Sequence, residues 1–364
     1  MLPVLHRLLL GRFISLVLFS TGALLGLLLS TRFFEIARFA ALGGIGWPLV
    51  TYTACQIPLI LPIVFPIGTA LASFFLFQEF SRSGGITSLR ASALSFRKLL
   101  TPILLAALFF SFLNGLLISD ISPLAKNKAR QLQREWKGIN PLALLKQKEL
   151  LLASGIEVVP LGDADPALFA EKVITAVRQN KNDRLLLITA DKLQRSDSAL
   201  DGENLSAFLY GEKKKGEFSD LYIDKSKTFS TDIEPLTFVI TKERSKPVPD
   251  HLSTPQFLKE LIKKESIFDK RKLYSEAARR LMITLAPFTF TLLGAASGLM
   301  IGRKGSLKPQ LILIGLTALF LAAFFLGKSF DTRIAVAIPC FLAPHLFLVI
   351  AALKRLNRLK MGIE

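Results

Sequence analysis

The chain has 364 residues, 51% of them hydrophobic and 20% charged, with a mean hydropathy of +0.44 and a formal net charge of +18. A hydropathy this high beside so many charges means that apolar and charged residues are segregated along the chain. That pattern excludes an all-soluble protein and indicates a membrane protein with a polar insert. The only cysteines, Cys55 and Cys340, lie in apolar segments and form no CxxC pair, which excludes a disulfide framework and a cysteine metal site.

Six apolar segments are long enough to cross a bilayer, whose hydrocarbon core requires about 20 residues in helical form. None of them contains an acidic or basic residue. They are Phe13–Ser30, Leu49–Phe77, Leu99–Ser119, Leu281–Ile301, Pro309–Leu326 and Ile334–Leu353. We therefore predict an α-helical membrane protein with six transmembrane helices, three on each side of an inserted β-rich domain. The first segment is longer than the apolar region of a signal peptide, and no A-x-A-like cleavage site follows it. We therefore expect it to be retained as a membrane anchor.

The second segment is too long for one straight crossing. Pro58, Pro62 and Pro66 lie four residues apart within it. Because each proline removes one backbone hydrogen-bond donor, the segment is expected to form a bent helix.

The distribution of Lys and Arg over the short connections predicts the orientation of the spans. The N-terminal segment, the loops after spans two and four and the C-terminal tail carry thirteen basic residues against two acidic ones. The two short connections on the other side carry four basic residues against two acidic ones. Both termini are therefore predicted to be cytoplasmic and the insert to face outward. This asymmetry also accounts for much of the positive charge, so the pI of about 10.0 does not require a nucleic-acid partner.

Between Asp120 and Leu252 the long apolar runs give way to short segments separated by turn-rich clusters. Their length and punctuation predict mostly antiparallel strands and favour a small sandwich. The predicted strand segments are Glu149–Val159, Arg184–Thr189, Leu205–Tyr210, Leu221–Asp224 and Leu236–Thr241. The segment Asp165–Gln179 is predicted as a helix, because Pro166 stands near its start and apolar residues recur at helical spacing.

Two helical segments connect the insert to the fourth span. Ser253-Thr254-Pro255 is typical of a helix start, with a capping hydroxyl before a proline in the first turn. A second helical segment, Ile267–Arg280, is expected to run into span four. The predicted domains are 1–119 (the first three spans), 120–252 (the β-rich insert), 253–280 (the connecting helices) and 281–364 (the last three spans and a basic tail).

Glycines four residues apart occur in two spans, Gly22 and Gly26 in the first and Gly294 and Gly298 in the fourth. Small residues at this spacing let helices approach closely in lipid, so we predict that these four glycines lie at helix-packing contacts. A phosphate-binding loop is disfavoured because the chain has no G-x-x-x-x-G-K-[ST] sequence. The three histidines are scattered and the spans hold no acidic residue, so we expect no metal site and no enzymatic activity.

The loop between spans two and three carries the most informative motif, Ile86–Ser95 (ITSLRASALS). This stretch resembles the cytoplasmic coupling helix of the lipopolysaccharide-export permeases of the LptF/LptG type, which typically reads ELTALRAAGIS. Other features agree in order, namely Asn140-Pro141, the acidic–arginine pair Glu276 and Arg280 before span four, and Pro344 in the last span. Two positions depart from the family pattern, because its glutamate falls on Gly85 and its glycine on Ala93.

The resemblance implies a permease subunit of an ABC exporter in the inner membrane of a Gram-negative bacterium. Such an exporter extracts lipopolysaccharide from the inner membrane and passes it through a periplasmic jelly roll toward the outer membrane. The two paralogous permeases of the family would form a heterodimer, and this chain would be either one of them. A periplasmic bridge protein would receive the lipopolysaccharide. A separate cytoplasmic ATPase dimer would hydrolyse ATP, so this chain itself would bind no cofactor.

The resemblance also implies that a coupling helix at about residues 78–95 contacts the ATPase. Its expected contact residues are Glu79, Arg82, Ile86, Thr87, Leu89 and Arg90. The alternative is a basic connector that only fixes topology. We prefer coupling because an apolar stripe at helical spacing, which a connector does not need, suits a helix docked in a groove.

The implied substrate has a polyanionic head and apolar acyl chains, so cations and apolar walls at the outer rim of the spans are its expected contacts. The candidates are Arg32, Phe33, Phe34 and Arg38, with Arg279 and Arg280 behind them. The arginines are explained nearly as well as interfacial anchors that extend to lipid headgroups.

Two other functions stay open at this point. Another class of ABC permease typically has four spans with a large domain after the first, which the three-plus-three division disfavours. A non-transporting scaffold with a partner-binding outer domain would need neither a coupling helix nor an ATPase.

Overall fold

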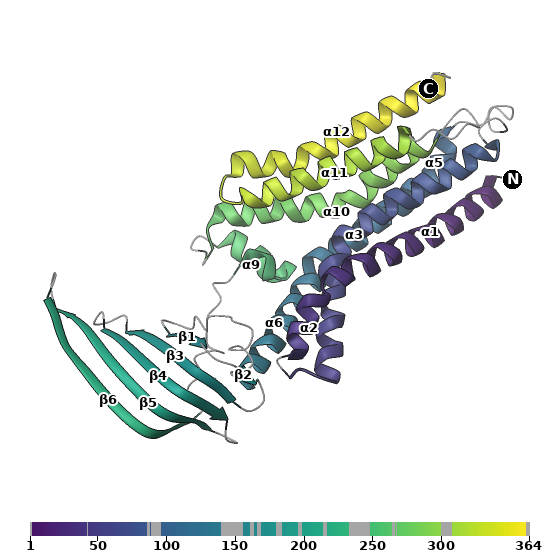
Figure 1. Ribbon diagram of the computed structural model, residues 1–364. Helices are drawn as coiled ribbons and strands as arrows, with labels where there is room; N and C mark the ends of the chain where they lie inside the picture. The colour runs from purple at the N-terminus through teal and green to yellow at the C-terminus, as the bar shows by residue number, and fades with distance from the viewer. Residues whose placement is uncertain are drawn as a thin grey trace. The chain divides into compact units, whose positions relative to one another are not determined.

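The computed structural model divides the chain into two compact units, which are described separately below (Figure 1). The first unit comprises Met1–Arg32, Ala54–Asn127 and Pro247–Glu364, and the second comprises Phe33–Thr53 and Lys128–Lys246. The residues that the structure describes are 2–41, 43–85, 88, 96–139, 156–160, 164–165, 169–179, 184–195, 199–213, 217–232, 248–263, 266, 268–299 and 308–361.

Six described helices are long and apolar enough to cross a membrane, as the sequence predicts. They are α1 (Leu2–Thr31), α3 (Trp47–Arg82), α5 (Phe96–Leu116), α10 (Lys270–Gly298), α11 (Lys308–Ser329) and α12 (Ile334–Met361). All six run side by side in Figure 1. Helix α5 continues without a break through a π-helix, η1 (Leu117–Ile121), into α6 (Ser122–Ile139). The chain is therefore a multi-pass membrane protein.

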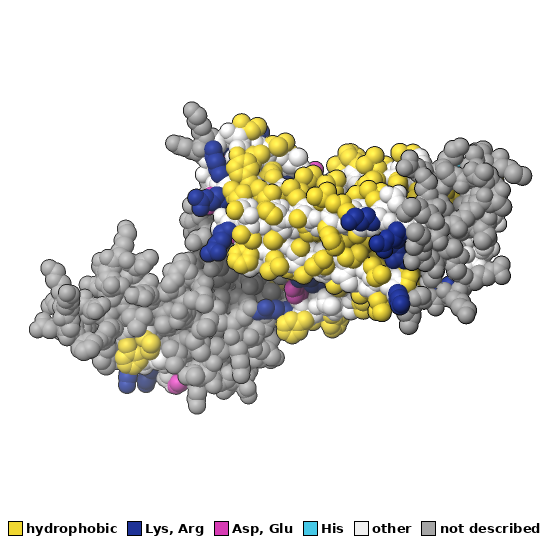
Figure 2. Space-filling view, turned by 90° about the horizontal axis from the view of Figure 1, so that it is seen from above, with side chains coloured by type: hydrophobic (Ala, Val, Ile, Leu, Met, Phe, Trp, Pro, Cys, Tyr) yellow, Lys and Arg dark blue, Asp and Glu magenta, His cyan; other side chains and the backbone are white. Residues whose placement is uncertain are grey.

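Helix α10 forms the centre of the first unit, since most of its apolar part is buried. Two apolar clusters lie against it. One contains Phe13, Phe77 and Ile103 from α1, α3 and α5, and the other contains Phe290 and Phe341 from α10 and α12. The outer faces of the helices stay apolar, as a lipid environment requires. Figure 2 shows hydrophobic side chains over most of the described face in view, with Lys and Arg side chains toward its ends.

The described strands of the second unit form one antiparallel sheet with the order β1-β3-β4-β5-β6, in which β2 also pairs with β3. The strands are β1 (Ile156–Pro160), β2 (Ala164–Asp165), β3 (Phe169–Gln179), β4 (Arg184–Arg195), β5 (Ala199–Lys213) and β6 (Glu217–Asp232). Four predicted strand segments overlap β1, β4, β5 and β6, although Glu149–Gly155 and Leu236–Thr241 lie outside the described residues. A sandwich needs a second sheet, and the described part of the insert contains only this one.

The predicted helix Asp165–Gln179 is wrong, because residues 169–179 form strand β3 at the interior of the sheet. Four of its residues, at positions 173, 174, 175 and 177, are β-branched, which favours a strand. The register places Thr175 opposite both Val158 of β1 and Ile188 of β4. Pairing on both edges therefore outweighs the helical spacing of the apolar residues.

Two helical segments extend the architecture beyond the sequence prediction. Residues 122–139, predicted to open the β-rich insert, instead continue α5 as α6. A short helix, α2 (Phe33–Ala41), follows α1 and buries Phe39, whose ring stacks on Tyr52 at 4.4 Å between centroids. Gln133 of α6 donates a hydrogen bond to the Tyr52 hydroxyl at 2.7 Å. These contacts organise the helical part of the second unit.

Candidate functional site

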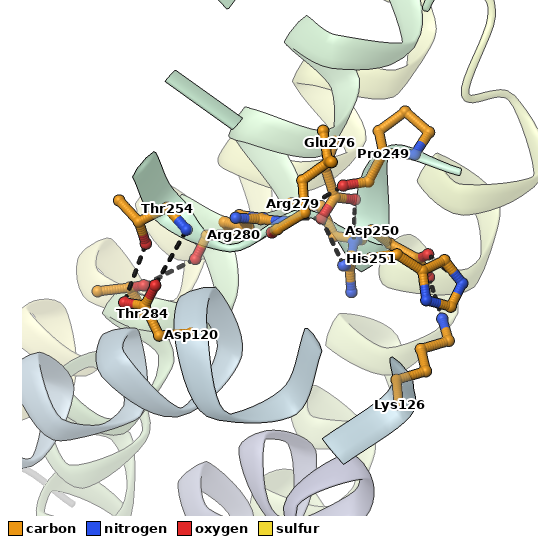
Figure 3. Close-up of polar contacts among 11 residues, drawn as sticks. Asp120, Lys126, Pro249, Asp250, His251, Thr254, Glu276, Arg279, Arg280 and Thr284 are labelled. Atoms are coloured by element: carbon orange, nitrogen blue, oxygen red, sulfur yellow. Dashed lines mark hydrogen bonds and ion pairs between the residues drawn. The ribbon is translucent and has the colours of Figure 1, made fainter. Parts of the chain in front are cut away.

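A cluster of polar side chains joins four elements of the first unit where the connection from the insert meets the spans (Figure 3). The elements are the η1–α6 junction, the short helix η2 (Pro249–His251), helix α9 (Thr254–Ile262) and the start of α10. The cluster, called here the junction cluster, consists of Asp120, Lys126, Asp250, His251, Thr254, Glu276, Arg279 and Arg280. It connects the chain leaving span three with the chain entering span four.

Asp120 caps the N-terminus of α9. The Thr254 backbone N–H donates to Asp120 Oδ1 at 3.0 Å, and the Thr254 hydroxyl donates to Oδ2 at 3.0 Å. Ser253 occupies the N-cap position but makes no capping hydrogen bond with its side chain. The predicted helix start is therefore confirmed, but the capping group comes from a residue 134 positions earlier. Asp120 lies in the π-helix η1, a type of irregularity that often occurs at functional sites.

Glu276 binds two arginines at the start of α10. Its Oε1 accepts hydrogen bonds from Arg280 Nε at 2.9 Å and from Arg279 Nη2 at 2.7 Å, and its Oε2 accepts one from Arg279 Nε at 2.7 Å. The acidic–arginine pair that the sequence singles out is thus a direct contact. Since Glu276 and Arg280 are only 8% and 6% exposed, their charges are compensated inside the protein.

Arg280 also ties α10 to the segment that returns from the insert. Its Nη2 donates to the carbonyl oxygens of Leu252 at 2.7 Å and Pro249 at 3.3 Å. The guanidinium carbon lies 4.5 Å from the centre of the Phe257 ring in α9, a cation–π distance. One side chain thereby fixes η2 and α9 against α10.

Asp250 forms the second charged contact of the cluster, an ion pair with Lys126 of α6. Burial alone would raise the Asp250 pKa, but the Lys126 hydrogen bond and the charges of Lys126, His251 and Arg279 together lower it below its ordinary value. Asn127 adds a hydrogen bond to the His251 carbonyl at 3.1 Å. The carboxylate of Asp250 therefore holds η2 against α6 in its charged form.

The junction cluster changes the interpretation of the predicted substrate contacts. Arg279 and Arg280 are brought together around Glu276 and are almost fully buried, so their first role is structural. Arg32 follows the last residue of α1, and Arg38 lies in α2. Phe33 and Phe34 are 70% and 76% exposed, which leaves their rings available for apolar contacts.

A charged contact outside the junction cluster joins the N-terminal part of α1 to the C-terminal part of α3. Arg12 Nη2 lies 2.5 Å from Glu79 Oε1, and both side chains are 54% exposed. Helix α3 ends at Arg82, and the turn that follows contains Gly84 at a φ of +78°, a conformation that favours glycine. The chain leaves α3 there toward the predicted coupling residues Ile86, Thr87, Leu89 and Arg90, which lie outside the described residues.

Gly85 stands where the family pattern has its glutamate, and the structure shows why a side chain does not fit. A Cβ atom at this position would lie 2.7 Å from the Phe80 ring and 2.8 Å from the Phe80 carbonyl oxygen. Glutamate at this position would therefore require the turn after α3 to change.

The predicted helix-packing glycines divide into two groups. A Cβ atom on Gly294 would lie 2.2 Å from the Ala70 carbonyl oxygen, and one on Gly298 would lie 2.4 Å from the Phe74 carbonyl oxygen. These two glycines therefore permit the close approach of α10 and α3, as predicted. Gly22 and Gly26 make no such contact within the described part of this chain, because an added Cβ meets no described atom within 4 Å at either position. Helix packing at these two glycines therefore stays a prediction.

Comparison with known proteins agrees with this architecture. The family model described as "Lipopolysaccharide export system permease LptF/LptG" matches residues 7–358. None of the curated proteins gives a significant match to the chain. Because the family match covers both halves of the membrane part and the insert, the chain belongs to the LptF/LptG family of lipopolysaccharide export permeases.

Proposed function

We propose that this chain is one permease subunit of an ABC exporter that extracts lipopolysaccharide from the inner membrane and sends it toward the outer membrane. The observation that carries the proposal is the family match over residues 7–358, on a chain with six candidate membrane spans. A homologous permease completes the transport channel as a heterodimer. A separate cytoplasmic ATPase dimer supplies the energy, so this chain has no catalytic role and binds no cofactor of its own.

The proposed orientation places both termini and the 78–95 loop in the cytoplasm and the β-rich insert in the periplasm. The excess of Lys and Arg on one set of connections supports it. The Arg12–Glu79 contact also supports it, because it puts the start of α1 at the same level as the end of α3. The basic N-terminal segment and the basic 78–95 loop therefore leave the membrane on one side.

Residues 78–95 are proposed to transmit movement from the ATPase to the spans. Helix α3 is continuous from Trp47 to Arg82, so a force applied beyond Gly84 acts on a long helix that is packed against α10. In this proposal Ile86 and Leu89 enter a groove of the ATPase and Arg90 contacts its rim. In the family, the glutamate before the coupling motif helps to dock the coupling helix in the ATPase groove. This chain has Gly85 at that position, where a side chain would meet Phe80, so another residue makes the contact.

Lipopolysaccharide is proposed to enter between the two permeases from the outer leaflet and then to pass along the periplasmic domain to the bridge protein. Arg32 and Arg38 attract its phosphates, while Phe33 and Phe34 contact its acyl chains. The exposed rings of Phe33 and Phe34 support the apolar part of this role, while Arg32 and Arg38 are part-buried. We assign Arg279 and Arg280 instead to the framework that holds η2 and α9 against α10, because Glu276 already binds both guanidiniums.

Purification of the tagged full-length chain from its native membranes tests the proposal. Mass spectrometry of the purified material is expected to find a homologous six-span permease, an ABC ATPase and a lipid A-containing glycolipid. A chain that purifies with other outer-face proteins and without any ATPase would instead support a non-transporting scaffold.

A further inference from the structure

Prolines interrupt the backbone hydrogen bonds of two neighbouring spans at the same level. In a regular helix, each carbonyl accepts a hydrogen bond from the N–H group four residues later. Pro62 and Pro66 therefore leave the carbonyls of Pro58 and Pro62 in α3 without their helical donor, and Pro287 does the same to Ile283 in α10. Inside a membrane no water can replace these donors, so other protein groups must do so.

Asn114 of α5 supplies two of the missing donors. Its Nδ2 atom donates to the Pro62 carbonyl of α3 at 3.1 Å and to the Ile283 carbonyl of α10 at 2.8 Å. A side-chain amide has two N–H groups, one for each acceptor. The side chain is 0% exposed, so both hydrogen bonds lie in the interior of the bundle. One residue thus satisfies the proline gaps of two helices.

Ser111, one turn before Asn114 in α5, makes a hydrogen bond to α10 next to the same proline. The Phe288 backbone N–H donates to Ser111 Oγ at 3.0 Å, across the gap made by Pro287. Gly115, next to Asn114, allows the two helices to approach, because a Cβ there would lie 2.9 Å from the Thr284 methyl group. Helix α5 is therefore shaped along one face to receive the broken part of α10.

The Pro58 carbonyl has a different donor. Ser122 at the start of α6 donates to the Pro58 carbonyl at 2.5 Å, a contact that involves α3 but not α10. This difference makes Ser122 a natural control for Asn114.

We propose that Asn114 joins the proline interruptions of α3 and α10 into one hinge, so that the two helices bend together about α5 during transport. Helix α3 leads to the 78–95 loop, and α10 begins at the junction cluster, so the hinge lies on the direct connection between them. The hydrogen bonds that Asn114 makes to both helices are described contacts. The use of the hinge in transport rests on the proposed function.

A double-mutant cycle on the full-length permease in detergent tests the shared hydrogen bonds. Asn114→Leu removes both donors at nearly constant size, and the unfolding equilibrium is expected to shift about three- to twenty-fold for each lost hydrogen bond. Pro287→Ala restores an N–H that can donate to the Ile283 carbonyl, and Pro66→Ala does the same for the Pro62 carbonyl. The effect of Asn114→Leu should therefore shrink in either proline variant and nearly vanish when both are combined.

Equal effects of Asn114→Leu in all four backgrounds would overturn the proposal. If Asn114→Leu does not fold, Asn114→Ser, which keeps one shorter donor, replaces it in the same cycle with the same order of effects. The control is Ser122→Ala, which should couple to Pro62→Ala but add independently to Pro287→Ala.

The transport role needs a measurement that a purely structural role would not change. In the triple variant Asn114→Leu/Pro66→Ala/Pro287→Ala, backbone donors satisfy the Pro62 and Ile283 carbonyls. The variant has lost Asn114 and the two prolines whose gaps it fills, while Pro58 and Pro62 remain in α3. Reconstituted with its partners, it should recover the stability of the parent while moving several-fold less lipopolysaccharide per ATP hydrolysed. Parental transport by this stable variant would overturn the hinge. Absence of transport by the parent complex would instead refute the proposed function and leave the unfolding cycle valid.

Discussion

Arg280 Nε donates a 2.9 Å hydrogen bond to Glu276 Oε1, one helical turn earlier on α10, and both side chains are buried. The same guanidinium binds two carbonyls of the segment that returns from the insert, those of Pro249 and Leu252. Glu276 and Arg280 therefore neutralise each other's charge inside the protein. Arg280 also attaches η2 and α9 to the fourth span.

Replacing Glu276 with Gln should destabilise the first unit strongly. Both arginines would lose their carboxylate partner while Arg280 stayed buried, and breaking a buried pair in this way typically costs about 3–5 kcal/mol. Thermal unfolding of the purified protein in detergent measures the loss. The matched control is Glu79→Gln, whose partner Arg12 is 54% exposed, so its loss should be under about 1 kcal/mol. Equal losses for the two variants would contradict a structural role for Glu276.

Because Asp120 caps α9, replacing Asp120 and replacing the N-cap residue Ser253 should affect the stability of this helix start differently. Asp120→Ala removes both hydrogen bonds to Thr254 and should destabilise the start of α9 by about 1 kcal/mol. Ser253→Ala should have little effect, because the Ser253 side chain makes no capping hydrogen bond. Hydrogen exchange of the first amides of α9 reports the difference. Faster exchange in Ser253→Ala than in Asp120→Ala would show that the cap is local after all.

The Lys126–Asp250 contact predicts a dependence of stability on pH. Because the folded protein holds the Asp250 pKa below its ordinary value, the carboxylate stabilises the fold above about pH 4, and this contribution disappears as the pH falls through the lowered pKa. Asp250→Asn should therefore unfold more easily than the parent at pH 7, by about 1–3 kcal/mol. The difference should narrow at pH 3. Lys128→Gln, at an exposed position in the same helix, serves as the control and should change stability little at either pH.

The proposed substrate contacts predict a loss of lipopolysaccharide crosslinking. The charge reversals Arg32→Glu and Arg38→Glu, introduced together, should weaken photocrosslinking of lipopolysaccharide to a probe at position 34 several-fold, because the phosphates would meet negative charge. The double variant Arg32→Lys/Arg38→Lys keeps the charge and is expected to retain most of the crosslinking. If the reversed variant crosslinks as the parent does, the arginines act as headgroup anchors.

The spans and their order follow from the sequence because each membrane helix satisfies its own backbone and must be apolar over its length. The Glu276–Arg280 contact also follows, since residues four apart on a helix are neighbours. The capping of Thr254 by Asp120 could not be read in this way, because it joins residues 134 positions apart through the fold. For the hydrogen bonds that satisfy the carbonyls freed by proline, the sequence offers one signal, which is the polar residue Asn114 in an otherwise apolar span.

The insert shows where local patterns fail. Residues 169–179 have apolar spacing that suits a helix, but strands β1 and β4 pair with both of their edges. The choice between helix and strand was decided by partners distant in the chain, which a local pattern does not contain. Helix α2 was missed because it has only 9 residues, too few for a clear periodic signal.

The glycines of α10 and α1 have the same spacing in the sequence, but their replacement by alanine should affect stability differently. Gly298→Ala places a methyl group 2.4 Å from the Phe74 carbonyl oxygen, so α10 and α3 must separate, and unfolding in detergent should become easier by about 1–3 kcal/mol. Gly22→Ala adds a methyl group at a position with no described atom within 4 Å and should leave the isolated chain unchanged or slightly more stable, since alanine favours helix. If Gly22→Ala lowers stability only when the partner permease is present, α1 meets that partner at this glycine. Loss of stability in the isolated chain would mean instead that α1 packs more tightly within its own subunit than the described contacts show.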